Sequence, residues 1–275
     1  MSVAVMLREG TDRLRGMTDA PRLEAEMLLA RAMGRPRTGL LTHPEWFPSP
    51  EERATYQRWL DQRVGGVPLP YLTGRVAFYG LEVTVTRDVL IPRPETETLV
   101  ELALAAEPQV VVDVGTGSGA IALALAAHLP RTHVIATDLS AGALRVAAAN
   151  VRCHGLSERV RLVQADLVRP LVLSADLVIS NPPYVATGEW DVLPESIRRH
   201  EPALALLGGD DGLAVIRRLL ESASRILRPG GGLLVEIGAG QGRAATKLAR
   251  SLLPDARVRI HPDLAGRDRV LDVGF

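Results

Sequence analysis

Cysteine, lysine and net charge are what this 275-residue sequence has least of. Cys153 is its single cysteine, which excludes an internal disulfide and any zinc or iron–sulfur site built from cysteines, and we predict no metal site. Lys247 is its single lysine, a bias that indicates a GC-rich genome rather than a function. The 32 basic and 32 acidic residues cancel, so no net field favours a polyanion, and direct nucleic-acid binding is not expected.

Long apolar runs are also missing. No charge-free stretch approaches the ~20 residues that span a membrane, and the first residues lack the basic and apolar regions of a signal peptide. We therefore expect a cytoplasmic protein with no membrane partner. Apolar residues nevertheless make up 47% of the chain, enough to fill the cores of one large and one small domain.

The first part of the chain has a helical pattern. Up to about Arg63, apolar residues recur at spacings of three and four. Asp19 followed by Pro21 marks one helix start, and Ser49 to Glu52 has the form of a capping box with proline in the first turn. The stretch Gly65 to Pro70 should then break any helix, because it combines glycine and proline.

From residue 109 the sequence pattern changes to runs rich in β-branched residues that alternate with helical runs. The seven runs are QVVVDVG, THVIATD, RVRLVQAD, ADLVISN, GGLLVEIG, ARVRIHP and RVLDVGF. They predict a doubly wound, mostly parallel α/β sheet. The last two runs are too close for an intervening helix, so they should form a hairpin that adds an antiparallel strand. That ending is typical of class I methyltransferases.

Together these patterns predict three parts. Residues 76–89 alternate in the manner of a β-hairpin, which we interpret as a connection between a helical region and the α/β region. The predicted parts are a helical N-terminal domain over residues 1–74, a β-hairpin linker over residues 75–92 and a Rossmann-like catalytic domain over residues 93–275.

A glycine-rich loop follows the first strand of the predicted sheet and opens a helix. Its residues are Gly115, Thr116, Gly117, Ser118 and Gly119. Glycines at such a turn let the backbone approach a ligand, but the pattern also fits a nicotinamide-binding loop or a structural turn. Asp138, at the end of the second strand, lies ~20 residues after the glycine loop. At that offset a carboxylate accepts hydrogen bonds from ribose hydroxyls, so a nucleoside ligand is favoured.

Two further segments bear on this ligand. Asp166 ends the third strand where such folds hold an adenine, and Leu167 can pack on the ring; alternatively, Asp166 only caps the next turn. A second glycine cluster, Gly238 to Gly242, follows the fifth strand, away from the expected switch point of the sheet. We interpret that second cluster as structural.

Asn181-Pro182-Pro183-Tyr184 follows the fourth strand, which a doubly wound sheet places beside the glycine loop. An amide nitrogen is a poor nucleophile because its lone pair is delocalised, so an enzyme that alkylates it must hold both N–H bonds and aim the lone pair. The Asn181 side-chain oxygen and the Pro182 carbonyl are suitable acceptors, and we predict both as catalytic. Pro183 and Tyr184 complete the predicted substrate site, while a rigid turn is the alternative.

The tetrapeptide resembles the motif of amino-methyltransferases, which act on adenine, guanine or glutamine nitrogen. Other segments are similar to the signature of the PrmC/HemK family of release factor glutamine methyltransferases: Pro70–Gly74, Phe78, Gly80–Leu81, Leu90–Glu97, His200–Leu204 and Gly208–Gly212. This resemblance covers nearly the whole chain. Relatives that modify a ribosomal protein usually depart from the pattern after the Pro-Arg pair, whereas this chain keeps Pro94 to Glu97.

The resemblance implies a function. S-adenosylmethionine would be the methyl donor and S-adenosylhomocysteine the product, and class I peptide chain release factors would be the protein substrate, docked by the helical domain and methylated at N5 of the Gly-Gly-Gln glutamine. Residues 115–119, Asp138, Asp166, Leu167 and Asn181 would hold the cofactor. The alternatives are a ribosomal-protein glutamine methyltransferase, a nucleic-acid amino-methyltransferase and a nucleoside-binding translation partner without turnover. Arg93 and Glu95 form either a linker ion pair or part of the active-site mouth.

Overall fold

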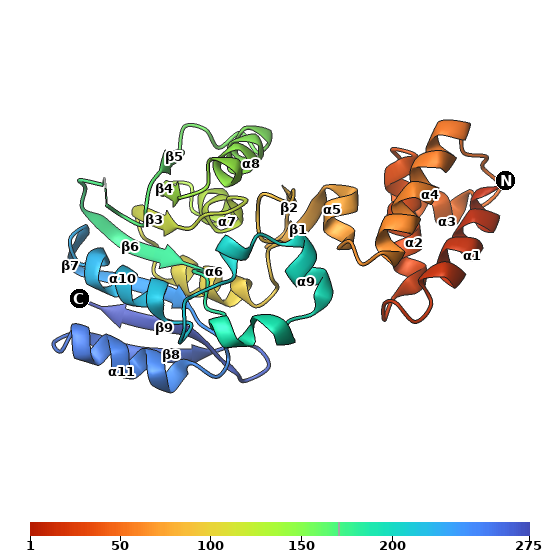
Figure 1. The fold of residues 1–275 in the computed structure, drawn as a ribbon. Coiled ribbons are helices and arrows are strands. Elements are labelled where there is room, and N and C mark those ends of the chain that lie inside the picture. The colour runs from red at the N-terminus through yellow and green to blue at the C-terminus, as the bar shows by residue number, and fades with distance from the viewer. Residues whose placement is uncertain (170) are drawn as a thin grey trace. The chain divides into compact units, whose positions relative to one another are not determined.

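The computed structural model describes residues 1–169 and 171–275 (Figure 1). Its contacts divide the chain into two compact units, the first comprising Met1–Arg75 with Pro194–His200 and the second Val76–Leu193 with Glu201–Phe275. The first unit is helical, with α1 (Val3–Leu14), α2 (Pro21–Ala32), α3 (Arg37–Thr42), α4 (Pro50–Val64), α5 (Leu69–Thr73) and α9 (Glu195–His200). Every helix in the described ranges is too short or too polar to span a bilayer.

Local sequence signals set the helix ends of the first unit. The capping box of α4 is confirmed: the Ser49 hydroxyl accepts the Glu52 backbone N–H at 3.2 Å, and the Glu52 carboxylate accepts the Ser49 N–H at 2.7 Å. The helix start at Pro21 is confirmed as well, although no side chain caps it. The helix-breaking segment is only partly confirmed, because α5 already begins at Leu69; proline in a first turn costs no hydrogen bond.

The second unit contains a two-stranded hairpin and a seven-stranded sheet. The hairpin consists of β1 (Arg75–Phe78) and β2 (Leu81–Thr84). The sheet has the order β5-β4-β3-β6-β7-β9-β8. Its strands are β3 (Val110–Val114), β4 (His133–Asp138), β5 (Val160–Gln164), β6 (Ala175–Ser180), β7 (Leu227–Glu236), β8 (Arg257–Pro262) and β9 (Asp268–Gly274). All seven runs predicted as strands are confirmed.

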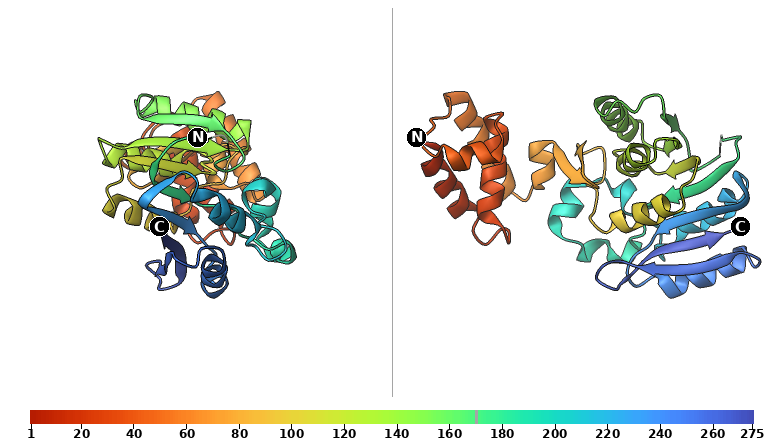
Figure 2. Two further views of the ribbon diagram at one scale, coloured as in Figure 1. Left: turned by 90° about the vertical axis from the view of Figure 1, so that its left-hand side faces the viewer. Right: turned by 180° about the vertical axis from the view of Figure 1, so that it is seen from behind.

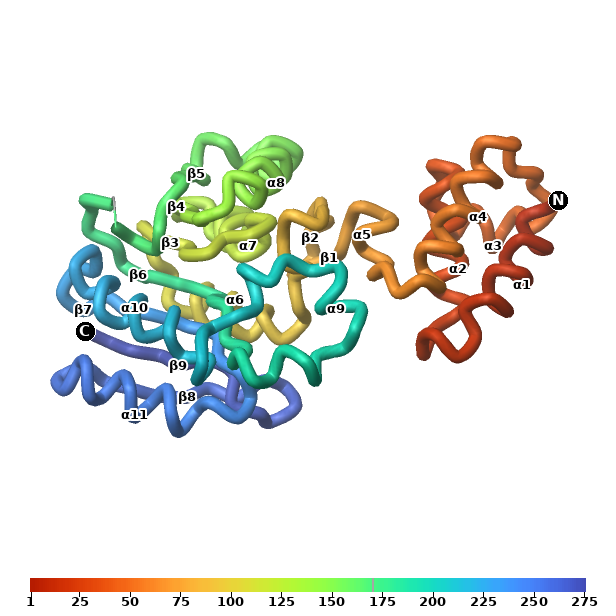
Figure 3. Tube along the Cα trace, viewed as in Figure 1, coloured from red at the N-terminus to blue at the C-terminus, as the bar shows by residue number. Residues whose placement is uncertain are grey.

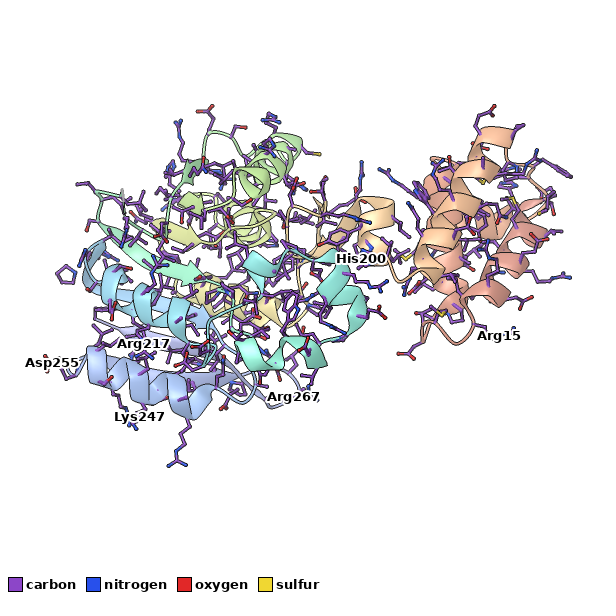
Figure 4. All side chains as sticks on the ribbon, viewed as in Figure 1. Arg15, His200, Arg217, Lys247, Asp255 and Arg267 are labelled. Atoms are coloured by element: carbon purple, nitrogen blue, oxygen red, sulfur yellow. The ribbon has the colours of Figure 1, made fainter. Side chains whose placement is uncertain are left out.

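The sheet is parallel except for β9, which pairs antiparallel with both β7 and β8. This confirms the predicted terminal hairpin. Helices cover both faces (Figure 2). One apolar cluster joins the sheet to α6 (Thr96–Ala105), α7 (Ala120–His128) and α8 (Ala141–Cys153), and another joins it to α10 (Ala214–Ala223) and α11 (Gly242–Leu252). The outer sides of α10 and α11 carry exposed charges such as Arg217 and Lys247 (Figure 4).

Strand order positions the site. The chain moves from β3 to β4 and β5 on one side, then returns to place β6 on the other side of β3, a path that can be followed in Figure 3. Loops that leave β3 and β6 therefore diverge at the carboxyl edge and leave a crevice there. Short 3₁₀ turns, η1 (Thr187–Val192) and η2 (Ala203–Ala205), belong to the segment that follows β6.

Candidate active site

The glycine loop leaves β3 in a conformation that requires glycine. Gly115 and Gly117 have φ of 72° and 56°, and a Cβ at either position would meet nothing within 4 Å, so backbone angle and not space selects glycine there. Gly119 combines a positive φ with a close approach to Ala147 of α8, at 3.3 Å from an added Cβ. The loop can therefore bring backbone N–H groups and the start of α7 up to a ligand.

Asp138 supports this loop from the end of β4. One of its carboxylate oxygens accepts the Gly117 N–H at 2.9 Å and the other accepts the Ser140 N–H at 2.8 Å. The side chain is half-buried and lines the same cavity as the loop. Because each carboxylate oxygen has a second lone pair, Asp138 can hold the loop and still accept hydrogen bonds from a ligand.

The Asn181-Pro182-Pro183-Tyr184 loop leaves β6 beside the glycine loop. Just before it, the buried Ser180 hydroxyl donates to the Val114 carbonyl at 2.7 Å, which joins the ends of β6 and β3. The Asn181 side-chain nitrogen donates to the Thr96 hydroxyl at 3.0 Å. That bond occupies the nitrogen end of the amide and leaves the oxygen end to accept from a substrate.

The far end of this loop is fixed by two other segments. Gln241, in the second glycine cluster, donates to the Tyr184 carbonyl at 2.9 Å, so the cluster is structural but acts on the predicted substrate site. A Cβ on Gly208 would lie 2.5 Å from the Pro183 carbonyl oxygen, and one on Gly212 would collide with the Tyr184 carbonyl oxygen. Only glycine fits at these two positions, because the tetrapeptide packs directly against their backbone and leaves no room for a Cβ.

Two buried carboxylic acids lie near the loops. Asp113, at the end of β3, accepts a hydrogen bond from Thr116 at 2.6 Å, and burial raises its pKa to about 7. Glu236, at the end of β7, is fully buried and lies 3.5 Å from the Tyr184 hydroxyl. Burial raises the pKa of Glu236 to about 7 and that of Tyr184 to about 12, so Tyr184 is neutral at physiological pH.

Arg93 pairs with Glu201, not with Glu95 as a linker pair would require. The Arg93 guanidinium lies 2.6 Å from the carboxylate of Glu201, whose side chain is 2% exposed and also accepts the Ile91 N–H at 3.2 Å. Pro92 and Pro202, which flank this pair in the sequence, both line the cavity. The pair therefore joins two segments of the cavity wall, which favours the role at the active-site mouth.

One cavity of about 240 Å³ contains most of the predicted site residues. It is lined by Gly115, Thr116, Gly117, Ser118, Asp138, Asp166, Leu167, Asn181, Pro182 and Pro183, whereas Gly119 and Tyr184 do not line it. Asp166 does not stand free at the rim: Arg218 of α10 binds its carboxylate at 2.6 Å. Carboxylates, backbone N–H groups and apolar side chains such as Leu139 suit a nucleoside with a charged tail.

A larger depression, of about 770 Å³, lies at the other end of the strands, where Gln109 and Asp176 line it. Its residues lie away from both loops, so the smaller cavity is the candidate site. Sequence reasoning missed several residues that shape that cavity: Thr96, Asn150, Arg218, Glu236 and Gln241. Thr96 lay within a recognised signature and Gln241 within the second glycine cluster, but none of the five stands in a local pattern that indicates its partner.

Comparisons with known proteins agree with this architecture. The model of the PrmC N-terminal domain matches residues 6–74, and that of the methyltransferase small domain matches residues 94–208. A methyltransferase from Pyrococcus furiosus has a similar crystal structure, with a TM-score of 0.57 and 19% identity over 72% of this chain and 90% of its own. At that identity the likeness shows the fold alone, and it confirms the predicted methyltransferase fold.

Two full-length relatives are more informative. The release factor glutamine methyltransferase of Moorella thermoacetica is 46% identical over 98% of this chain and 97% of its own length. That of Cereibacter sphaeroides is 44% identical over 98% of both chains. The predicted resemblance is confirmed, and the chain belongs to the release factor glutamine methyltransferase family.

Proposed function

We propose that the protein transfers the methyl group of S-adenosylmethionine to the side-chain amide nitrogen of the Gly-Gly-Gln glutamine in class I peptide chain release factors. The observation that carries this proposal is the convergence of the glycine loop and Asn181 to Pro183 on one cavity. Family membership supports the release factor as the substrate. The proposal places the protein in the cytosol, where release factors act.

The cofactor would lie along the glycine loop. Asp138 would accept its ribose hydroxyls, and Leu167 and Leu139 would pack on its adenine. Asp166 is held by Arg218, which fixes the carboxylate at the edge of the proposed adenine site. When bound, S-adenosylmethionine supplies an electrophilic methyl group on a positively charged sulfur.

The chain's own residues would orient the glutamine. The Asn181 side-chain oxygen and the Pro182 carbonyl would accept the two N–H bonds of the target amide, which directs its lone pair at the methyl carbon. Asn181 has its nitrogen end bound to Thr96, so its oxygen end is the one available. Methyl transfer would first give a cationic amide that carries the new methyl group and both original hydrogens on its nitrogen. This cation is strongly acidic and loses one proton readily to give the neutral N-methyl amide, so orientation and hydrogen bonding account for the catalysis.

Methylation of a purified release factor tests the function directly. We expect the intact mass of the release factor to rise by one methyl group, and replacement of the Gly-Gly-Gln glutamine by alanine should abolish the increase. Labelled cofactor offered with ribosomal protein, ribosomal RNA or DNA provides the controls. Label in any of these, with the release factor unmodified, would overturn the substrate assignment.

Asn181→Ala tests the chemical step. We expect kcat to fall by ~10²-fold or more, because one preorganised acceptor is lost from the active site. Cofactor affinity should fall much less, since the glycine loop and Asp138 are untouched. Single-turnover rates at saturating release factor, measured with cofactor binding, separate the two effects. Near-normal turnover would mean that the tetrapeptide is a structural turn.

The helical domain over residues 1–74 would dock the release factor. Its surface carries exposed apolar side chains, among them Phe47 at 76% and Leu41 at 49% exposure, as a protein-binding surface requires. If Phe47 contributes to docking, Phe47→Ser should raise KM for the release factor and leave cofactor affinity unchanged. An unaltered KM would remove Phe47 from the docking surface.

A further inference from the structure

The proposed chemistry depends on which end of the Asn181 amide faces the substrate. The oxygen end accepts hydrogen bonds, whereas the nitrogen end donates them. A flipped amide would point its N–H bonds at the N–H bonds of the target glutamine and repel them. The two orientations have nearly the same shape, so packing alone cannot select between them; a hydrogen-bond partner must do so.

Thr96 is the partner that the structure provides. Its hydroxyl, 4% exposed at the start of α6, accepts from the Asn181 side-chain nitrogen at 3.0 Å. A hydroxyl can donate as well as accept, however, so Thr96 alone would tolerate a flipped Asn181 by donating to its oxygen. Selection requires that the hydroxyl hydrogen of Thr96 is already committed elsewhere.

Glu236 is placed to take that hydrogen. In the parallel pairing of β6 and β7, Ser180 lies opposite Val235, so Asn181 and Glu236 are the next residues along two adjacent strands. The Glu236 carboxylate is fully buried, and the Thr96 hydroxyl is among the groups that lower its pKa. An ionised carboxylate only accepts, so in a hydrogen bond between the two Thr96 is the donor and keeps a lone pair for Asn181.

Building on the proposed function, we propose that Thr96 donates its hydroxyl hydrogen to Glu236, and that both are positioning residues that fix the amide of Asn181 with its oxygen toward the substrate. The same carboxylate lies 3.5 Å from the hydroxyl of Tyr184, at the other end of the tetrapeptide. Its second oxygen has no hydrogen-bond partner among residues 1–169 and 171–275. A buried acid with an unused acceptor costs stability, which is expected where function requires the charge.

The ionisation of Glu236 should therefore affect turnover. Burial raises its pKa to about 7, and the negative charge of Glu95 raises it further. The hydroxyls of Thr96 and Tyr184 and the positive charge of Arg269 lower it. Protonated Glu236 can donate to Thr96, which frees the Thr96 hydrogen and permits the flipped amide. The productive orientation, and with it kcat, should increase as pH rises through about 7.

Three variants test the inference on full-length protein with release factor and S-adenosylmethionine. Thr96→Val removes the hydroxyl at similar volume and should lower the single-turnover rate by ~10-fold or more, with cofactor affinity within ~2-fold. Thr96→Ser keeps the hydroxyl and should stay within ~3-fold of wild type. Glu236→Gln cannot ionise and should lose the rise in kcat between about pH 6 and about pH 8.

Rescue by serine separates orientation from packing, because Thr96→Ser changes the packing and keeps the hydrogen bond. Equal rates for Thr96→Val and wild type would overturn the inference. So would a serine variant as slow as the valine variant, or an unchanged pH profile in Glu236→Gln. Should Thr96→Val fail to fold, the serine and glutamine variants still decide.

A second readout does not depend on the substrate. In NMR spectra, the Asn181 side-chain amide protons should keep their hydrogen-bonded shift in Thr96→Ser and lose it in Thr96→Val. Should wild-type enzyme leave release factors unmodified, the proposed function fails while this comparison still decides on Thr96. Identical Asn181 resonances in all proteins would refute the positioning role even if release factors are methylated.

Discussion

Asn150 of α8 joins the hairpin to the glycine loop. Its side-chain nitrogen donates to the carbonyls of Thr84 and Ser118, both at 2.9 Å, and its oxygen accepts the Thr84 N–H at 2.8 Å. The residue is 1% exposed, so water cannot replace these bonds. At about 1 kcal/mol per bond, plus the cost of leaving the Ser118 carbonyl unsatisfied, Asn150→Ala should destabilise the α/β unit by ~3–5 kcal/mol.

Two more variants refine the test. Asn150→Asp keeps an acceptor for the Thr84 N–H but cannot donate to either carbonyl when ionised, so it should lose as much stability as the alanine variant. Arg152→Ala, at an exposed position of the same helix, is the matched control and should change the unfolding free energy by less than ~0.5 kcal/mol.

Urea unfolding followed by circular dichroism measures these differences, and calorimetry with S-adenosylmethionine measures their effect on the loop. Because Asn150 holds the Ser118 carbonyl, we expect cofactor affinity to fall together with stability. A loss below ~1 kcal/mol for Asn150→Ala would refute the reasoning, since three buried hydrogen bonds would then contribute almost nothing.

Three further predictions concern the site. Gly208→Ala should destabilise the loop by ~1–3 kcal/mol and slow turnover, because its Cβ would lie 2.5 Å from the Pro183 carbonyl; Gly188→Ala, which meets nothing within 4 Å, is the control in the same assays. Asp138→Ala should weaken S-adenosylmethionine binding by ~1.5–3 kcal/mol by calorimetry, and unchanged affinity would exclude Asp138 from the site. Burial raises the pKa of Glu236 from 4.5 to about 7, so the folded state holds its proton more tightly than the unfolded state and folding stability should fall as pH rises from 4.5 to about 7. The loss should reach about 3 kcal/mol relative to Glu236→Gln, measured by denaturation at several pH values. Parallel plots of stability against pH for the two proteins would contradict the shift.

The sequence predicted the sheet well because strands carry local signals. Each β-rich run is short, apolar and bounded by turn residues, and the close spacing of the last two required a hairpin. The capping box before α4 was also a local signal. Placing the tetrapeptide beside the glycine loop needed only strand order, which the parallel topology restricts.

The supporting contacts could not be predicted in the same way. Arg93 and Glu201 are 108 positions apart, and Asn181 and Thr96 are 85 apart. Glu236 was hidden at the end of an apolar strand, where a glutamate is indistinguishable from a surface residue without knowledge of what covers it. Local patterns determine elements, whereas these pairings depend on which loops the finished sheet brings together.

The distribution of these contacts explains why the recognised motif extends over nearly the whole chain. Orientation of an amide requires acceptors held to a fraction of an ångström, and a four-residue loop has too few internal contacts to hold itself. Thr96 from α6, Gln241 before α11 and the Gly208 turn each fix a different atom of Asn181 to Tyr184. A substitution in any of these distant segments should therefore reduce turnover by misplacing the tetrapeptide, even where cofactor binding is intact.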